Sequence, residues 1–212
     1  MKTLKLLFYS IIIISILSAC SSKEDNALET INNNMFKTLY DFKSYEPIET
    51  KFDSLKKDKY GDTLIFSNVM MIKYAMDDFD KAKEEFEKAR ETAEIYRPTY
   101  NPSSFSSKKY IEAQETMNKC YVEMNDYIAI MDSLSTIVRT LEKKCDGQFY
   151  GWLVTHKFRC KTKGGNSTIG TYYYFMDKNC RNIYRYFDED ELSMENYKSL
   201  VDDSLKPNES DK

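Results

Sequence analysis

The sequence predicts an α+β fold. It begins with an N-terminal helix, continues with a long antiparallel, coiled-coil-like helical hairpin, and ends with a C-terminal three-stranded antiparallel meander and a short helix. Apolar residues between positions 65 and 145 recur at alternating steps of three and four, the helical period, and from position 152 at steps of two, the strand period. A proline-containing segment at 98–102 divides the helical region into two arms.

The N-terminal helix is expected over residues 27–43. Its apolar side chains have the spacing of an amphipathic helix: Leu28, Ile31, Met35, Leu39 and Phe42. Pro47 follows soon after and cannot continue a helix. Three residues then alternate with charged ones and predict a short strand: Ile48, Thr50 and Phe52.

A hairpin is expected in the insertion 62–145. Its seam, meaning the positions that face the opposite arm, is formed in the first arm by Ile65, Val69, Ile72, Met76, Phe79, Phe86 and Ala93, with Lys83 and Arg90 at two further seam positions. Eleven seam positions of the second arm alternate strictly: Tyr110, Ala113, Met117, Cys120, Met124, Tyr127, Met131, Leu134, Val138, Leu141 and Cys145. This alternation is typical of coiled coils, and each arm would be about 50–60 Å long.

The meander is expected over residues 149–188. One face of its first strand carries Trp152, Val154, His156, Phe158 and Cys160. Gly164-Gly165 predicts a hairpin turn. A terminal helix is expected at about 191–205 and a disordered tail at 206–212. We therefore expect one α+β domain, residues 27–205, into which the helical hairpin is inserted.

The first twenty residues have the pattern of a signal peptide. Lys2 and Lys5 precede an apolar stretch at 6–17, which is short for a membrane span. The stretch closes on Leu17-Ser18-Ala19-Cys20, which resembles the lipobox of bacterial lipoproteins. That resemblance implies that residues 1–19 are a signal peptide, that Cys20 carries diacylglyceryl and acyl (palmitate) chains, and that residues 20–26 tether the protein to a membrane. An ordinary secretory signal or an uncleaved anchor is the alternative.

The residues after Cys20 bear on the final location. Ser21 replaces the aspartate of inner-membrane retention, and Lys23-Glu24-Asp25 is similar to the acidic export tag of Bacteroidetes-type lipoproteins. The resemblance implies a lipid-anchored outer-membrane protein in the cell envelope, either periplasmic or surface-exposed. A plain polar tether is the alternative interpretation of the acidic segment.

Two further segments resemble those of Bacteroidetes-type lipoproteins of unknown function. They are Ser44-Tyr45-Glu46-Pro47-Ile48 and the hairpin sequence GWLVTHKFR at 151–159. Neither is a catalytic signature, so the resemblance implies no activity. Asp-Ser/Thr-apolar triplets look like the O-glycosylation sites of secreted proteins in the same bacteria, and the accessible candidates are Ser54, Thr63 and Ser204.

Charge and composition exclude several classes of function. The chain has 31 Lys and Arg residues, two of them within residues 1–19, against 34 Asp and Glu residues, so the mature protein is acidic and a nucleic-acid partner is not expected. The single histidine, His156, cannot build a histidine metal site or a dyad, so we expect no metal and no cofactor. His156 is either a hydrogen-bonded core residue or a catalytic base, and no catalytic motif accompanies it; we therefore expect no enzyme.

Four cysteines follow Cys20, and an envelope compartment favours disulfides. Cys120 and Cys145 would lie about 37 Å apart on one helix, whereas a disulfide needs Cα atoms within about 7 Å. Cys145–Cys180 is the expected pair, because the meander brings position 150 close to position 180. Cys120–Cys160 follows by elimination, with two buried free thiols as the alternative.

These patterns favour a non-catalytic protein-interaction or scaffold module. The long seam and its polar positions at Lys83 and Arg90 point to a protein partner that docks on the hairpin. The alternative is a module that binds a glycan or another small ligand. Its candidate residues are two basic side chains of the first meander strand and two tyrosines of the second: Lys157, Arg159, Tyr172 and Tyr174.

Overall fold

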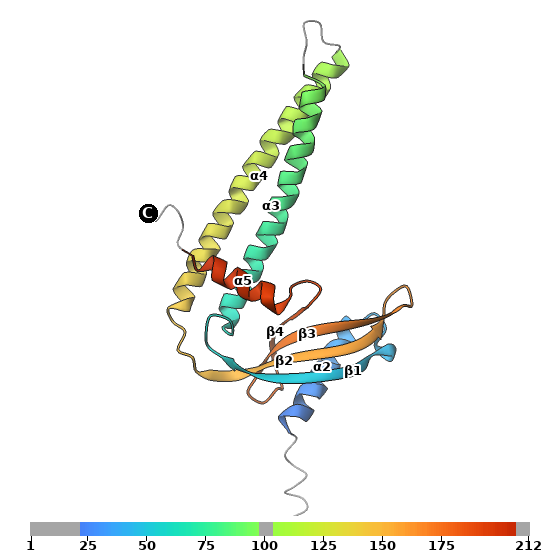
Figure 1. The fold of residues 1–212 in the computed structure, drawn as a ribbon, viewed down its shortest axis with the longest axis vertical. Coiled ribbons are helices and arrows are strands. Elements are labelled where there is room, and N and C mark those ends of the chain that lie inside the picture. The colour runs from blue at the N-terminus through green and yellow to red at the C-terminus, as the bar shows by residue number, and fades with distance from the viewer. Residues whose placement is uncertain (1–21, 98–103, 207–212) are drawn as a thin grey trace, which may run out of the picture. The chain divides into compact units, whose positions relative to one another are not determined.

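The computed structural model describes residues 22–97 and 104–206 (Figure 1). Within these residues it contains four α-helices and one four-stranded antiparallel sheet, so the expected α+β class is confirmed. The chain forms two compact units. Of the described residues, the sheet unit comprises 22–57 and 147–194, and the hairpin unit comprises 58–97, 104–146 and 195–206. The C-terminal helix, expected to complete a single domain, thus belongs to the hairpin unit.

The sheet has the order β1-β2-β3-β4, and all its neighbours are antiparallel. Its strands are β1 (Glu46–Lys56), β2 (Phe149–Lys161), β3 (Ser167–Asp177) and β4 (Ile183–Asp188). The expectation of three strands was wrong, because β1 pairs along most of β2, with Thr50 opposite His156. Alternation within a segment predicts a strand, but it does not identify a neighbour that lies about a hundred residues away in the chain.

Helix α2 (Lys23–Thr38) lies on one face of this sheet (Figure 1). Ser22 and Asp25 form a capping box, which starts the helix four residues before the expected position. The helix ends at Thr38, and a 3₁₀ turn, η1 (Phe42–Ser44), leads into β1. The core on this face combines three buried α2 residues with side chains of β2 and β3: Ala27, Ile31, Met35, Val154, Phe158, Tyr174 and Met176.

The hairpin unit contains α3 (Thr63–Ile95), α4 (Ser104–Glu142) and α5 (Met194–Ser204). Helices α3 and α4 run side by side along their length (Figure 1). Asp62 caps α3 by accepting hydrogen bonds from the backbone N–H groups of Leu64 and Ile65. Helix α5 packs against the start of α3, where the Tyr197 ring lies 5.4 Å from the Phe66 ring.

The seam of the second arm agrees with the sequence pattern. None of its eleven positions is exposed, and Ala113, Cys120, Leu134 and Val138 are buried. The strict alternation of steps of three and four was sufficient to predict this seam, because most of these residues are large and apolar.

The seam of the first arm agrees with the expected one at Ile65, Val69, Ile72 and Ala93, which are buried, but differs at three positions. Ala75, Ala82 and Ala89, which are spaced by seven residues, are buried, whereas Met76 is 40 % exposed and Lys83 and Arg90 are exposed. Lys83 and Arg90 are therefore not polar seam residues, because the alanine before each of them occupies the seam. Alanine has a small apolar surface and gives a weak hydrophobic pattern, yet it lets two helices approach closely.

Candidate functional site on the helical hairpin

One long flank of the hairpin combines basic and apolar side chains. Each of its residues follows a seam residue directly and recurs after seven positions, so on each helix these residues form one line. In an antiparallel pair, the two lines that follow equivalent seam positions lie on the same flank. We call this surface the basic flank; it consists of Lys83 and Arg90 of α3, of Arg97 just past the end of that helix, and of Gln114, Tyr121 and Ile128 of α4.

The α4 side of the basic flank leaves large apolar groups in water. Tyr121 is 59 % exposed and Ile128 is 44 % exposed, and the neighbouring Val122 is 57 % exposed. Ion pairs along the helix occur on both arms, for example Lys88–Glu84 on α3 and Lys119–Glu123 on α4. Exposed apolar side chains beside a line of basic ones make the basic flank a candidate docking surface.

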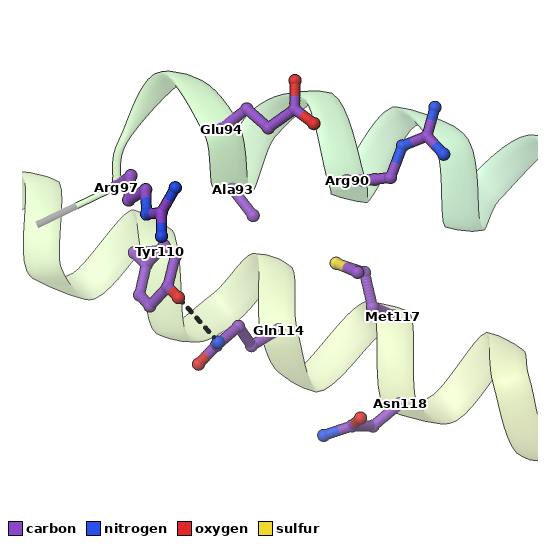
Figure 2. Close-up of a pocket in the computed structure, with 8 residues that line it drawn as sticks. All are labelled: Arg90, Ala93, Glu94, Arg97, Tyr110, Gln114, Met117 and Asn118. Carbon is purple, nitrogen blue, oxygen red and sulfur yellow. Dashed lines mark hydrogen bonds between the residues drawn. The ribbon is translucent and has the colours of Figure 1, made fainter.

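A groove of about 380 Å³ lies at the distal end of the basic flank (Figure 2). Its lining residues come from both helices: Arg90, Ala93, Glu94, Arg97, Tyr110, Gln114, Met117 and Asn118. Ala93 is the small seam residue opposite larger α4 side chains, and Figure 2 shows its methyl group and the Met117 side chain entering the space between the helices. Such unequal side chains leave a hollow that an equal pair would fill.

The charged lining of the groove consists of two arginines and one glutamate: Arg90, Arg97 and Glu94. The Tyr110 hydroxyl accepts a hydrogen bond of 2.8 Å from the Gln114 amide, which fixes both side chains at the rim. Arg90 contacts Glu87 at 2.6 Å on the exposed surface, and Arg97 lies one heptad further along the same line. Planar guanidinium groups bind carboxylates with two parallel hydrogen bonds. The geometry therefore provides two anion-binding side chains beside an apolar floor.

His156 lies in the core of the sheet unit. Its side chain is fully buried, its Nε2 lies 2.7 Å from the Tyr45 hydroxyl, and its Nδ1 lies 2.8 Å from the Thr50 hydroxyl. Burial lowers the pKa of His156 from 6.5 to about 4 and raises the pKa of Tyr45 to about 12. A neutral imidazole with both nitrogens paired is a structural element, which agrees with the interpretation of His156 as a hydrogen-bonded core residue.

The structure does not bring together the four residues predicted to bind a small ligand. Lys157 and Arg159 are exposed on one face of β2, whereas Tyr172 and Tyr174 are on the opposite face, the one that packs against α2. Tyr174 is fully buried, and its hydroxyl donates a hydrogen bond to the Asn34 side chain. Successive side chains of a strand point to opposite faces of the sheet. The basic residues of β2 and the tyrosines of β3 are therefore on different faces, although their positions are neighbours in the pairing of the two strands.

None of the expected disulfides is formed in the part of the chain that the structure describes. Cys120 occupies a small-residue position of the hairpin seam, and Cys160 and Cys180 belong to the core of the sheet unit. The pairing of Cys145 with Cys180 was inferred from strand register alone, but Cys145 follows α4, where its thiol faces the Leu141 carbonyl oxygen. Burial raises the pKa of Cys180 to about 11.

The O-glycosylation candidates differ in accessibility. Ser54 is exposed on β1, and Thr63 is half-buried at the first position of α3. Ser204 is buried and donates a hydrogen bond to the Leu200 carbonyl oxygen, so it is a poor acceptor for a glycan. Cys20 and the signal segment lie outside the described residues.

Metal-binding groups and membrane-spanning helices were also considered as sites. In the described ranges, no group of three metal-binding side chains gathers, and no helix is long and apolar enough to cross a membrane. The chain matches no family model, and no curated protein or solved structure matches it. What the hairpin does must therefore be inferred from its own geometry.

Proposed function

We propose that this chain is a lipid-anchored protein of the outer membrane that acts without catalysis, by docking a protein partner on its helical hairpin. The partner presents an amphipathic helix with acidic side chains. The observation that carries the proposal is the basic flank, where exposed apolar residues of α4 lie beside Lys83 and Arg90 of α3 and Arg97 just past its end. The lipid anchor at Cys20 rests on the lipobox resemblance.

A third helix fits the chemistry of the basic flank. Its apolar residues would cover Tyr121 and Ile128, which are now exposed to water. Its acidic residues would pair with Lys83 and Arg90, whose spacing of seven matches two helical turns, and with Arg97 past the end of α3. Burial of the aromatic group would supply affinity, and the charge pairs would set orientation and association rate.

A photocrosslinking experiment in living cells tests this function. A photoreactive phenylalanine derivative replaces Tyr121 in one variant and Tyr74, which is also exposed but on α3 outside the basic flank, in the other. We expect one stoichiometric protein adduct from position 121 and none from position 74. Equal adducts from both positions, or none from position 121, would contradict the proposal.

Charge reversal provides the matched control. Arg90→Glu combined with Arg97→Glu should abolish the adduct from position 121, because coupling of close interfacial charges is about 1.5 kcal/mol or more and each reversal then weakens association by at least about tenfold. Lys81→Glu combined with Lys88→Glu makes the same charge change at the same spacing on the same helix, outside the basic flank. That variant should keep the adduct.

The groove supports a second candidate function, the binding of a small anionic ligand such as an acidic glycan. Its support is the pair of arginines beside the Gln114 and Asn118 amides around a volume of about 380 Å³. Substitution of Asn118, which lines the groove but is not a basic-flank residue, by alanine separates the two functions. Binding of glucuronate, measured by calorimetry, should fall, whereas the adduct from position 121 should persist.

A further inference from the structure

Aromatic and basic side chains gather at the end of the sheet unit where α2 begins. The Lys23 ammonium lies 3.6 Å from the centre of the Trp152 ring and 5.5 Å from that of Phe52. The Phe149 and Trp152 rings make an edge contact at 5.2 Å, and the Lys178 ammonium lies 5.9 Å from the centre of the Phe149 ring. We call these five residues the aromatic–basic patch.

The patch is held by contacts between three elements of the same unit. The Trp152 indole N–H donates a hydrogen bond of 3.1 Å to the Lys178 carbonyl oxygen, which ties β2 to the turn after β3. The Asn26 amide donates one of 3.0 Å to the Asn179 carbonyl oxygen, which ties α2 to the same turn. Phe149 is 40 % exposed although it is a large apolar side chain. The patch is thus a fixed surface that combines exposed apolar area with cations.

The distance along the chain from the proposed lipid anchor to this patch is very short. The capping box makes Ser22 the first residue fixed at α2, and Cys20 precedes it by two residues. Two extended residues span at most about 7 Å. Lys23, a member of the patch, is the next residue after the cap. A lipid on Cys20 would therefore keep the patch close to the membrane surface.

We propose that the aromatic–basic patch is a second, non-covalent membrane contact, which docks the sheet unit on the interfacial region of the bilayer. The proposal rests on the lipid anchor of the proposed function. Tryptophan places its apolar ring and its N–H at this depth, and lysine extends its ammonium toward the headgroups. A lipid anchor alone leaves the orientation of the unit free, whereas an anchor combined with a docked patch fixes one end of the unit toward the lipid.

The charges around the patch set its lipid preference. Lys23 also contacts Glu24 at 3.6 Å, and Asp25 lies in the same turn of α2. These carboxylates offset the cations, so docking depends on the aromatic rings and requires no anionic lipid. Salt should therefore affect docking little, in contrast to a polybasic surface.

Trp152 is the only tryptophan of the chain and reports on its own environment. The experiment uses the full lipidated protein, reconstituted in vesicles of phosphatidylethanolamine and phosphatidylglycerol. Lipids brominated near the headgroup end of the acyl chain quench a tryptophan at the interface. We expect them to reduce Trp152 emission, and we expect acrylamide in the water to quench it less in vesicles than in the delipidated protein. Unchanged emission with brominated lipids would overturn the proposal.

The control moves the reporter to the opposite end of the same sheet. Ile169 is 52 % exposed and pairs with Arg159 near the far end of β2. Trp152→Phe combined with Ile169→Trp should show no quenching by brominated lipids, because docking at the patch keeps that end in water. Equal quenching at both positions would also overturn the proposal. Flotation with the vesicles is measured in parallel: protein that fails to float refutes the anchor, whereas protein that floats without quenching of Trp152 refutes only the docking.

Discussion

The buried imidazole of His156 makes the stability of the sheet unit depend on pH. The pKa of His156 is lowered from 6.5 to about 4, because burial disfavours the imidazolium. This difference corresponds to about 3 kcal/mol at roughly 1.4 kcal/mol per pH unit. Between pH 6.5 and 4 the unfolded chain binds a proton that the folded chain does not bind, so folding becomes less favourable as the pH falls.

The expected loss of stability is confined to a definite range of pH. Above pH 6.5, His156 is neutral in both states and makes no pH-dependent contribution. From there toward pH 4 the free energy of unfolding should fall by about 1.4 kcal/mol per pH unit, and below pH 4 this loss is complete at about 3 kcal/mol. The neighbouring phenol of Tyr45 titrates near 12 and does not contribute in this range.

Urea unfolding followed by Trp152 fluorescence measures the effect, because the single tryptophan is in the sheet unit. His156→Gln is the matched control, since its amide can still donate to one neighbour and accept from the other while it carries no titratable proton. The wild-type protein should lose more stability between pH 6.5 and 4.5 than this variant. Equal slopes for the two proteins would refute the reasoning.

Two other predictions concern packing and thiols. Ala82→Leu should lower the free energy of unfolding of the hairpin by about 1–3 kcal/mol, because the alanine seam has no space for the longer side chain. Lys83→Leu, on the exposed flank, should change the free energy of unfolding by less than about 0.5 kcal/mol. Urea titrations followed by the helical circular dichroism compare the two variants. Similar losses of stability in both would contradict the alanine seam. Ellman's reagent should label Cys145 first in the folded protein and the three buried thiols, Cys120, Cys160 and Cys180, only on unfolding, so that all four are titratable after denaturation. A smaller total would reveal disulfides.

The sequence alone determined the hydrophobic periods along the chain, and therefore which segments are helices and which are strands. Strict alternation along α4 predicted its seam, and the shared face of Trp152, His156 and Phe158 on β2 was also correct. Both predictions depend on the local geometry of one element, where side-chain direction follows from position in the chain. The same local information identified His156 as a core residue, because a histidine among large apolar neighbours is usually buried.

Only the tertiary structure decided which elements are neighbours and which faces they bury. It paired β1 with β2, placed Tyr172 and Lys157 on opposite faces of the sheet, and put Ala82 rather than Lys83 in the hairpin seam. Strand pairing depends on contacts between segments far apart in the chain, so local alternation cannot specify it. A seam of alanines is selected by the close approach of two backbones, because each methyl group adds little hydrophobic free energy of its own. For that reason the sequence pattern did not identify the basic flank, although Lys83 and Arg90 are seven residues apart.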